Sequence, residues 1–372
     1  MELMKFSGFI VQRDTTNNGI FASLLKLNSL ERFDLSTCLK LNEWLRKDVK
    51  RIVIIPHVNP DGDAIGSTIG LNDVFKHAGF ETQVIVPNDY PAYLEWLGSD
   101  DKPMVYDQNP DLCSRLIRSA DVLFLLDFSD FKRLGKLEEI VRSLSTPIVL
   151  IDHHPDPKIE TEYRFWDVNV SSTAELVYDF IVALGMEGHL KEIGANALLT
   201  GIIADTGSLS HNASRPGMYH VIAELINIGA DKEKVNEALY NNFSEKRMKL
   251  LGYCLSEKME VFPQFRTALI WLTSAELKRF NFQTGDTEGF VNYPLSIAGI
   301  VFTAFFMEKN GQIRLSFRSK GNFAVNEFSS AHFGGGGHRN ASGGDTKLSM
   351  KEAISLFKGL LPAYAEQLNK DC

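Results

Sequence analysis

Histidine and aspartate gather in three short segments of this chain, each directly after a run of apolar residues. The segment His57-Val-Asn-Pro-Asp61-Gly-Asp63 holds one imidazole and two carboxylates. Asp127 and the segment Asp152-His153-His154 follow two further apolar runs. Carboxylate oxygens with some imidazole nitrogens suit Mn²⁺, Mg²⁺ or Co²⁺ better than a structural zinc. The residue types therefore indicate chemistry that depends on divalent metal ions.

Each segment also has an ordinary structural interpretation. Pro60 and Gly62 favour a turn, in which Asp61 or Asp63 would cap the next helix. This interpretation does not explain why a carboxylate or an imidazole follows each of three apolar runs. Asp205 adds another carboxylate at the end of a helical run, where the helix dipole disfavours negative charge. Unpaired anions so close together would repel one another, and six or seven ligands are too many for one ion. Two metal ions are therefore implied.

The elements that must position these side chains form a βαβ pattern in the first half of the chain. The predicted strands are short, continuously apolar and rich in branched residues: Arg51–Ile55, Thr82–Val86, Val122–Leu126 and Ile148–Ile151. Helices are predicted over Ser67–Ala78, Lys136–Leu144 and Ala195–Ala204. In such a sheet the carboxyl ends of the strands form the ligand crevice, which is where the histidines and aspartates are expected.

The second half of the chain changes character. Residues 215–257 are predicted to form a helical connector, and longer β-like runs follow at Thr267–Leu272, Ile300–Phe306 and Ile313–Phe317, before a glycine-dense loop and an amphipathic helix from Met350. We expect a doubly wound, mainly parallel α/β catalytic domain and a smaller α+β domain with a mixed sheet, with the active site in the cleft between them. The predicted boundaries are an N-terminal extension over 1–33, the catalytic domain over 34–214, the connector over 215–257 and the second domain over 258–372.

Composition argues against several classes of protein. The net charge of -8 and the pI near 5.7 argue against binding of long nucleic acid, which needs clustered Lys and Arg. The four cysteines, scattered with no Cys-x-x-Cys pair, indicate neither disulfides nor a thiolate zinc site. No apolar run reaches the ~18 residues of a membrane span, and Met1–Arg13 lacks the features of a signal peptide. We therefore expect a cytoplasmic protein without a membrane partner.

Taken together, the motifs resemble those of the DHH phosphoesterases, a family named for the Asp-His-His seen here as residues 152–154. The chain contains His57-x-x-x-Asp61-x-Asp63, Asp127 in Leu-Asp-Phe-Ser-Asp130, Asp152-His153-His154 and Asp205-Thr-Gly, in the family's order. The segment Gly334-Gly-Gly-Gly-His338 resembles the signature of the DHH-associated domain. The resemblance runs from about Lys50 to the C-terminal helix.

The resemblance implies a role for each of these residues. One metal ion would be held by His57 and Asp61, and the other by Asp63, His153 and Asp205. Asp127 would bridge the two ions, which are expected to be Mn²⁺, with Mg²⁺ or Co²⁺ as alternatives. Asp152 would orient the imidazoles from behind, a partner that metal-bound histidines need in general. His154 would face the substrate phosphate, so Asp127 and His154 are the expected catalytic residues.

The glycine run could be a flexible hinge, but the residues around it favour an anion site. Arg318 precedes the run, and His338 and Arg339 follow it, which gives a small basic group inside an acidic protein. Backbone N–H groups at glycines bind anions together with such cations. We therefore predict a substrate-binding site formed by Arg318, Gly336, Gly337, His338 and Arg339.

The family resemblance implies phosphoester hydrolysis by two-metal activation of a bridging water. The domain arrangement is similar to that of oligoribonucleases that cleave short RNA to mononucleotides and convert 3′-phosphoadenosine 5′-phosphate to AMP. The alternatives are a phosphodiesterase for cyclic or linear dinucleotides (cyclic di-AMP or pApA) and a catalytically silent nucleotide-binding regulator. The expected partners are short RNA or nucleotide substrates, with a homodimer as an open alternative to the monomer.

Overall fold

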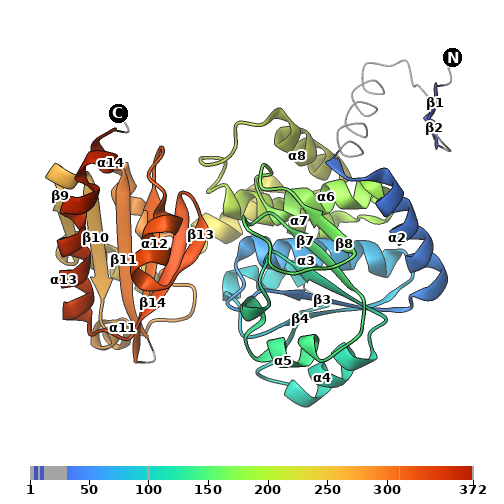
Figure 1. Ribbon diagram of the computed structural model, residues 1–372, viewed down its shortest axis with the longest axis horizontal. Coiled ribbons are helices and arrows are strands. Elements are labelled where there is room, and N and C mark those ends of the chain that lie inside the picture. Colours follow the sequence, from blue (N-terminus) through green and yellow to red (C-terminus); the bar gives the residue numbers. More distant parts are fainter. Residues whose placement is uncertain (1–3, 7–8, 12–31, 99–100, 310, 371–372) are drawn as a thin grey trace. The chain divides into compact units, whose positions relative to one another are not determined.

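The computed structural model describes residues 4–6, 9–11, 32–98, 101–309 and 311–370 (Figure 1). The chain divides into two compact units, Met1–Asn242 and Phe243–Cys372, and each contains a six-stranded sheet. Within the described ranges, no helix combines the length and the apolar character that crossing a membrane requires. The two sheets confirm the expected pairing of an α/β part with a smaller mixed-sheet part.

The first sheet is parallel throughout, with the strand order β5-β4-β3-β6-β7-β8. Its strands are β3 (Arg51–Pro56), β4 (Glu81–Val86), β5 (Met104–Val105), β6 (Val122–Leu126), β7 (Ile148–Asp152) and β8 (Tyr163–Trp166). Strand β3 pairs with β4 on one side and β6 on the other, so the strand order reverses between β3 and β6. Beyond the carboxyl ends of the strands, such a reversal opens the crevice in which doubly wound sheets bind ligands.

Alternating residues of these strands enter two hydrophobic cores, one on each face of the sheet. On β3, for example, Ile52 and Ile54 pack into one core, and Val53 and Ile55 pack into the other. The first face is covered by α2 (Leu35–Asp48), α3 (Gly62–His77), α6 (Thr173–Ala183), α7 (Glu192–Asp205) and α8 (Pro216–Ile228). The opposite face carries α4 (Pro110–Ser119) and α5 (Glu138–Arg142) (Figure 1). Burial on both faces explains why the strands are continuously apolar.

Glycines allow α3 and α7 to pack at unusually short range. A Cβ atom at Gly66 would lie 2.4 Å from the carbonyl oxygen of Ala197, and one at Gly201 would lie 2.7 Å from Oδ1 of Asp63. No larger residue fits at either position without moving a helix. This close approach brings the first turn of α3, which carries Asp63, against the last two turns of α7, which ends at Asp205.

Two predicted helices of the first unit differ from those observed. Helix α3 begins at Gly62 rather than Ser67, because Asp61 accepts hydrogen bonds from the first free N–H groups and so caps the helix earlier. The helix predicted over 136–144 is split into a 3₁₀ segment, η2 (Phe131–Leu137), and α5. Gly135 lies inside η2, and its φ of +57° is not helical, so the chain bends just before residue 136.

The predicted extension over residues 1–33 lies mostly outside the described residues. Two parts of it are described. One is a small antiparallel pair, β1 (Met4–Phe6) with β2 (Phe9–Val11), and the other is the end of the segment, where Arg32 forms ion pairs with Asp167 and Asp179.

The predicted connector is divided between the units. Helices α8 and α9 (Lys232–Asn236) pack into the first, and α10 (Glu245–Glu257) packs into the second.

The second sheet is mixed, with the order β13-β14-β12-β11-β10-β9. Its strands are β9 (Met259–Phe262), β10 (Thr267–Leu272), β11 (Phe302–Lys309), β12 (Gln312–Ser319), β13 (Gly336–His338) and β14 (Ala341–Thr346). Only the pair β10–β11 is parallel. One face packs on α12 (Val325–Phe333) and α13 (Met350–Leu360) through a core rich in phenylalanine, and the other packs on α10 and α11 (Ser274–Arg279).

The glycine-dense segment was expected to be a loop, and this prediction was wrong. Residues 336–338 and 341–346 form the antiparallel strands β13 and β14. A Cβ atom at Gly335 would lie 1.8 Å from the carbonyl oxygen of Gly343, so the two backbones approach where a side chain cannot fit. Glycine here permits close strand packing, whereas the sequence pattern alone suggested only flexibility.

Candidate metal centre

The first residues of the centre come from the turn between β3 and α3. His57 directly follows β3, is 3 % exposed, and its Nδ1 lies 2.9 Å from the carbonyl oxygen of Val58. When Nδ1–H donates this hydrogen bond, Nε2 keeps its lone pair and faces Oδ2 of Asp127 at 3.4 Å. Asp61 is the N-cap of α3 and accepts hydrogen bonds from the amides of Asp63 and Ala64 at 3.0 and 3.1 Å. The turn therefore presents one imidazole and one carboxylate in fixed orientations.

Asp63 lies in the first turn of α3 and is 2 % exposed. Its two oxygens accept hydrogen bonds from the amides of Thr173 and Ala174, at 2.7 and 2.9 Å, at the start of α6. Neither Thr173 nor Ala174 belongs to the site residues predicted from the sequence. The available signal was the segment Ser171-Ser-Thr-Ala-Glu175 before an apolar run, which is typical of a helix N-terminus.

Asp127 follows β6 and has a φ of +68°, in the left-handed region that aspartate tolerates better than most residues. Its amide donates to the carbonyl of Ile151 at 3.0 Å, which anchors this turn to β7. Oδ1 accepts a hydrogen bond from the hydroxyl of Thr173 at 2.8 Å and lies 3.7 Å from Nε2 of His153. With Oδ2 near His57, this carboxylate lies between two histidines.

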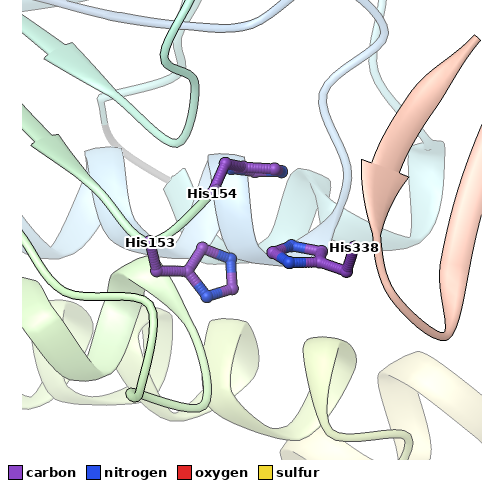
Figure 2. Close-up of side chains that lie close together, drawn as sticks. All are labelled: His153, His154 and His338. Carbon is purple, nitrogen blue, oxygen red and sulfur yellow. The ribbon is translucent and has the colours of Figure 1, made fainter. Parts of the chain in front are cut away.

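The end of β7 supplies Asp152, His153 and His154, and Figure 2 shows the two histidines. Asp152 is fully buried, and its Oδ1 accepts a hydrogen bond from Nδ1 of His154 at 2.8 Å. His153 is 3 % exposed, and its Nε2 lies 3.7 Å from Oδ2 of Asp205, at the end of α7. Successive residues after one strand therefore enter different parts of the centre.

The structure brings all six expected metal ligands together, in two groups whose potential ligand atoms lie within 4.8 Å of one another. The groups are His57, Asp61 and Asp127, and Asp63, His153 and Asp205. Asp127 lies within 4 Å of a histidine from each group. These two groups are the ligand sets that the family resemblance implies, and Asp127 also forms such a group with Asp152 and His154.

The electrostatics of the centre fit bound cations. Burial is the main cause that raises the pKa of Asp63 and of Asp127 well above the usual value, and neighbouring aspartates raise both further. Burial also lowers the pKa of His57, and it lowers that of His153 to about 4. Divalent cations would stabilise the ionised form of these carboxylates and the neutral form of these imidazoles. The residues present therefore fit two such ions.

Arg133 is a further residue near the centre that the sequence analysis missed. It lies on η2 and is exposed, and its carbonyl accepts a hydrogen bond from the amide of Val58 at 2.7 Å, next to His57. Burial is the main cause that lowers the pKa of His57 and lowers that of His154 to about 3, and the charge of Arg133 adds to both effects. In the described part of the chain no ion pair of Arg133 is found.

In the second unit the predicted substrate-binding residues lie at one end of the sheet. Ala341 of β14 pairs with Arg318 of β12 on one side and with His338 of β13 on the other. Figure 2 includes His338 on its strand. Gly337 has a φ of +138°, and a Cβ there would lie 2.6 Å from the carbonyl oxygen of Ala341, so glycine is required. The guanidinium of Arg339 donates to the carbonyl of Asn322 within this unit.

Residues 51–202 match the DHH family, N-terminal domain, and residues 270–362 match the DHHA1 domain. The chain belongs to the DHH family. The first match contains every expected metal ligand except Asp205, and the second contains Arg318 and the glycine strands. The resemblance inferred from the motifs is therefore confirmed for both domains.

A Streptococcus mutans protein named as a probable bifunctional oligoribonuclease and PAP phosphatase is 28 % identical over 310 residues, covering 83 % of this chain and 93 % of that protein. A Thermus thermophilus protein named as a bifunctional oligoribonuclease and PAP phosphatase is 28 % identical over 320 residues, covering 86 % and 90 %. A solved exopolyphosphatase-related protein from Bacteroides fragilis superposes with a TM-score of 0.86 at 37 % identity, covering 90 % of this chain and 98 % of that chain.

Proposed function

We propose that this protein is a metal-dependent phosphoesterase that cleaves short oligoribonucleotides to mononucleotides and removes a phosphate from 3′-phosphoadenosine 5′-phosphate to give AMP. The observation that carries the proposal is the convergence of two groups of carboxylate and imidazole ligands around Asp127. The names of the relatives that match most of the chain support the same substrates.

The two groups of ligands define the proposed metal sites. His57 and Asp61 would hold one ion, Asp63, His153 and Asp205 the other, and Asp127 would contact both. When bound, two divalent ions supply positive charge to a phosphate and lower the pKa of the attacking water. Mn²⁺ is the ion we favour over Mg²⁺ or Co²⁺, because the set mixes hard carboxylate oxygens with imidazole nitrogens.

The remaining residues of the centre would orient the substrate. The hydrogen bond that Nδ1 of His154 donates to Asp152 holds the ring of His154 in one orientation, and His154 is less buried than His153, with 24 % of its side chain exposed. We propose that His154 contacts a phosphate oxygen. Because a bound phosphate is anionic, it would raise the pKa of this imidazole and favour a proton on the ring.

The second unit would bind the part of the substrate away from the bond that is cleaved. Arg318 and His338 flank Ala341, and the glycine strands expose backbone at Gly336, where a Cβ would meet open space. We propose that these residues, with Gly337 and Arg339, bind a terminal phosphate or a sugar. A short substrate suits this small basic group, since the chain carries a net charge of -8.

A panel of substrates in Mn²⁺ tests the proposal. The panel contains di- to pentaribonucleotides, a long RNA, 3′-phosphoadenosine 5′-phosphate, cyclic di-AMP and pyrophosphate. We expect rapid hydrolysis of the short RNAs and of 3′-phosphoadenosine 5′-phosphate, and slow hydrolysis of the long RNA. Preferred hydrolysis of cyclic di-AMP would instead indicate a dinucleotide phosphodiesterase, and nucleotide binding without any hydrolysis would indicate a silent regulator.

A matched pair of variants links activity to the centre. His57→Ala removes a proposed ligand, whereas His77→Ala removes a histidine at the far end of α3, whose Nδ1 lies 2.8 Å from the carbonyl oxygen of Asp73. We expect His57→Ala to abolish hydrolysis and His77→Ala to retain it. Equal activity in the two variants would show that the metal centre is assigned to the wrong residues.

A further inference from the structure

Thr173 donates hydrogen bonds to a carboxylate from each of the two ligand groups. Its amide donates to Oδ2 of Asp63 at 2.7 Å, and its hydroxyl donates to Oδ1 of Asp127 at 2.8 Å. The next amide, of Ala174, donates to Oδ1 of Asp63 at 2.9 Å. Thr173 is fully buried, so water does not compete for these bonds.

The backbone of Thr173 is itself held firmly in place. Helix α6 has 11 residues, and its N-cap, Ser172, accepts a hydrogen bond from the amide of Glu175. The carboxylate of Glu175 in turn accepts two hydrogen bonds of 2.7 Å from Ser171 and forms an ion pair with Arg215. Because the first amides of a helix have no partner within it, those of Thr173 and Ala174 are free to bind Asp63.

Rotation of an aspartate carboxylate about χ2 is only weakly restricted by the side chain itself. A carboxylate that must offer chosen oxygens to two ions therefore needs an outside partner. For Asp63 the helix backbone supplies this partner, and for Asp127 the partner is the hydroxyl of Thr173. The hydroxyl occupies one lone pair of Oδ1 and leaves Oδ2 facing His57.

We propose that Thr173 is a positioning residue, whose hydroxyl orients the Asp127 carboxylate for both metal ions. The inference rests on the proposed metal centre and adds to it a residue outside the ligand set. Partners that orient metal ligands typically change metal affinity or activity by about 10- to 100-fold when removed. The loss of the hydroxyl should therefore weaken Mn²⁺ binding by at least about tenfold.

Three variants of the full-length protein separate this role from simple packing. Thr173→Val keeps the shape of the side chain and both backbone bonds to Asp63 but deletes the hydroxyl. Thr173→Ser restores the hydroxyl, and Thr173→Ala deletes it without a branched side chain should the valine variant fail to fold. The matched control is Thr200→Val, since Thr200 is also fully buried and its hydroxyl donates only to a helix carbonyl, that of Asn196, at 2.8 Å.

Calorimetric titration of the metal-free proteins with Mn²⁺ is the main measurement, with thermal unfolding of the metal-free proteins beside it. We expect Thr173→Val to bind Mn²⁺ at least about tenfold more weakly, Thr173→Ser to bind within a few-fold of wild type, and Thr200→Val to bind like wild type. The metal-free Thr173→Val and Thr200→Val proteins should unfold at similar temperatures. Turnover of a dinucleotide at saturating Mn²⁺ should fall in Thr173→Val and recover in Thr173→Ser.

The outcomes distinguish this inference from the proposed function. Wild-type protein that binds two Mn²⁺ ions while Thr173→Val binds them equally well would overturn the positioning role alone. So would a loss in Thr173→Val that Thr173→Ser fails to restore, or an equal loss in Thr200→Val. Wild-type protein that binds no Mn²⁺ would overturn the metal centre and, with it, this inference.

Discussion

Replacing Asp127 by asparagine should change stability in opposite directions in the metal-free and metal-bound protein. Asparagine has nearly the same shape but no charge. The oxygens of Asp61 and Asp127 lie within 4.8 Å, where two unit charges repel by about 3.5 kcal/mol at an effective dielectric constant of 20 and by about 1 kcal/mol in bulk water. Because Asp61 is exposed and Asp127 is buried, we take an intermediate value of about 2 kcal/mol.

Without metal, and at a pH high enough for Asp127 to be ionised, Asp127→Asn removes this repulsion, and the protein should therefore unfold about 4–8 °C higher than wild type. With metal, the same change removes the carboxylate that lies between the two ligand groups. Breaking one partner of a buried ionic contact costs about 3–5 kcal/mol, which corresponds to on the order of 10²- to 10⁴-fold weaker Mn²⁺ binding. The Mn²⁺-loaded variant should therefore unfold below Mn²⁺-loaded wild type.

Thermal unfolding with EDTA and with excess Mn²⁺ measures both effects in the same protein. Asp73→Asn is the matched control. Asp73, on α3, is likewise a buried carboxylate, but it lies outside the ligand groups and accepts a hydrogen bond from the amide of Lys191. The control should shift the unfolding temperature equally with and without Mn²⁺. If the unfolding temperature of Asp127→Asn shifts in the same direction with EDTA and with Mn²⁺, the reasoning is refuted. Such a result would show that Asp127 does not both repel Asp61 in the metal-free protein and bind metal in the loaded one.

The other predictions concern pH and the basic residues. In EDTA the difference in unfolding temperature between Asp127→Asn and wild type should widen as pH rises above about 4, because the folded-state pKa of Asp127 is raised above the ordinary 3.8, so wild type loses a proton that stabilises its folded form whereas asparagine does not titrate. The histidines of the centre, whose pKa values are lowered, titrate in both proteins, and a difference that narrows over pH 5–8 would contradict this. In steady-state kinetics, Arg133→Gln should raise KM for a dinucleotide several-fold with little change in kcat. The control Lys132→Gln, on the same 3₁₀ segment, should leave KM unchanged. Arg318→Ala should lower kcat/KM for a dinucleotide by on the order of 10²-fold while the Mn²⁺ content, measured by elemental analysis, stays unchanged.

Much of the centre could be predicted from the sequence because its ligands follow locally recognisable elements. A short, continuously apolar run identifies a buried strand without knowledge of its neighbours, and parallel strands place their carboxyl ends along one edge. His57, Asp127 and His153 could therefore be assigned to one crevice. Asp205 could be added because the apolar helix that it ends has a clear period.

Residues that act through distant partners could not be predicted in this way. Thr173 lies 110 positions from Asp63 and 46 from Asp127, and nothing in its local sequence indicates either partner. The same holds for Arg133, whose place beside His57 depends on the backbone bond to Val58. Such contacts follow from how helices pack on the sheet, which local patterns do not specify.

The sequence by itself determined the donor types, the parallel sheet that carries them and the two-domain plan, because these depend on composition and hydrophobic period. Only the tertiary structure decided which donors face each other, which carboxylates are held by the start of α6, and that the glycine segment forms strands rather than a loop. The physical reason is close packing. Gly201 lets α7 approach Asp63, and Gly335 lets two strands meet, at distances that only the folded backbone defines.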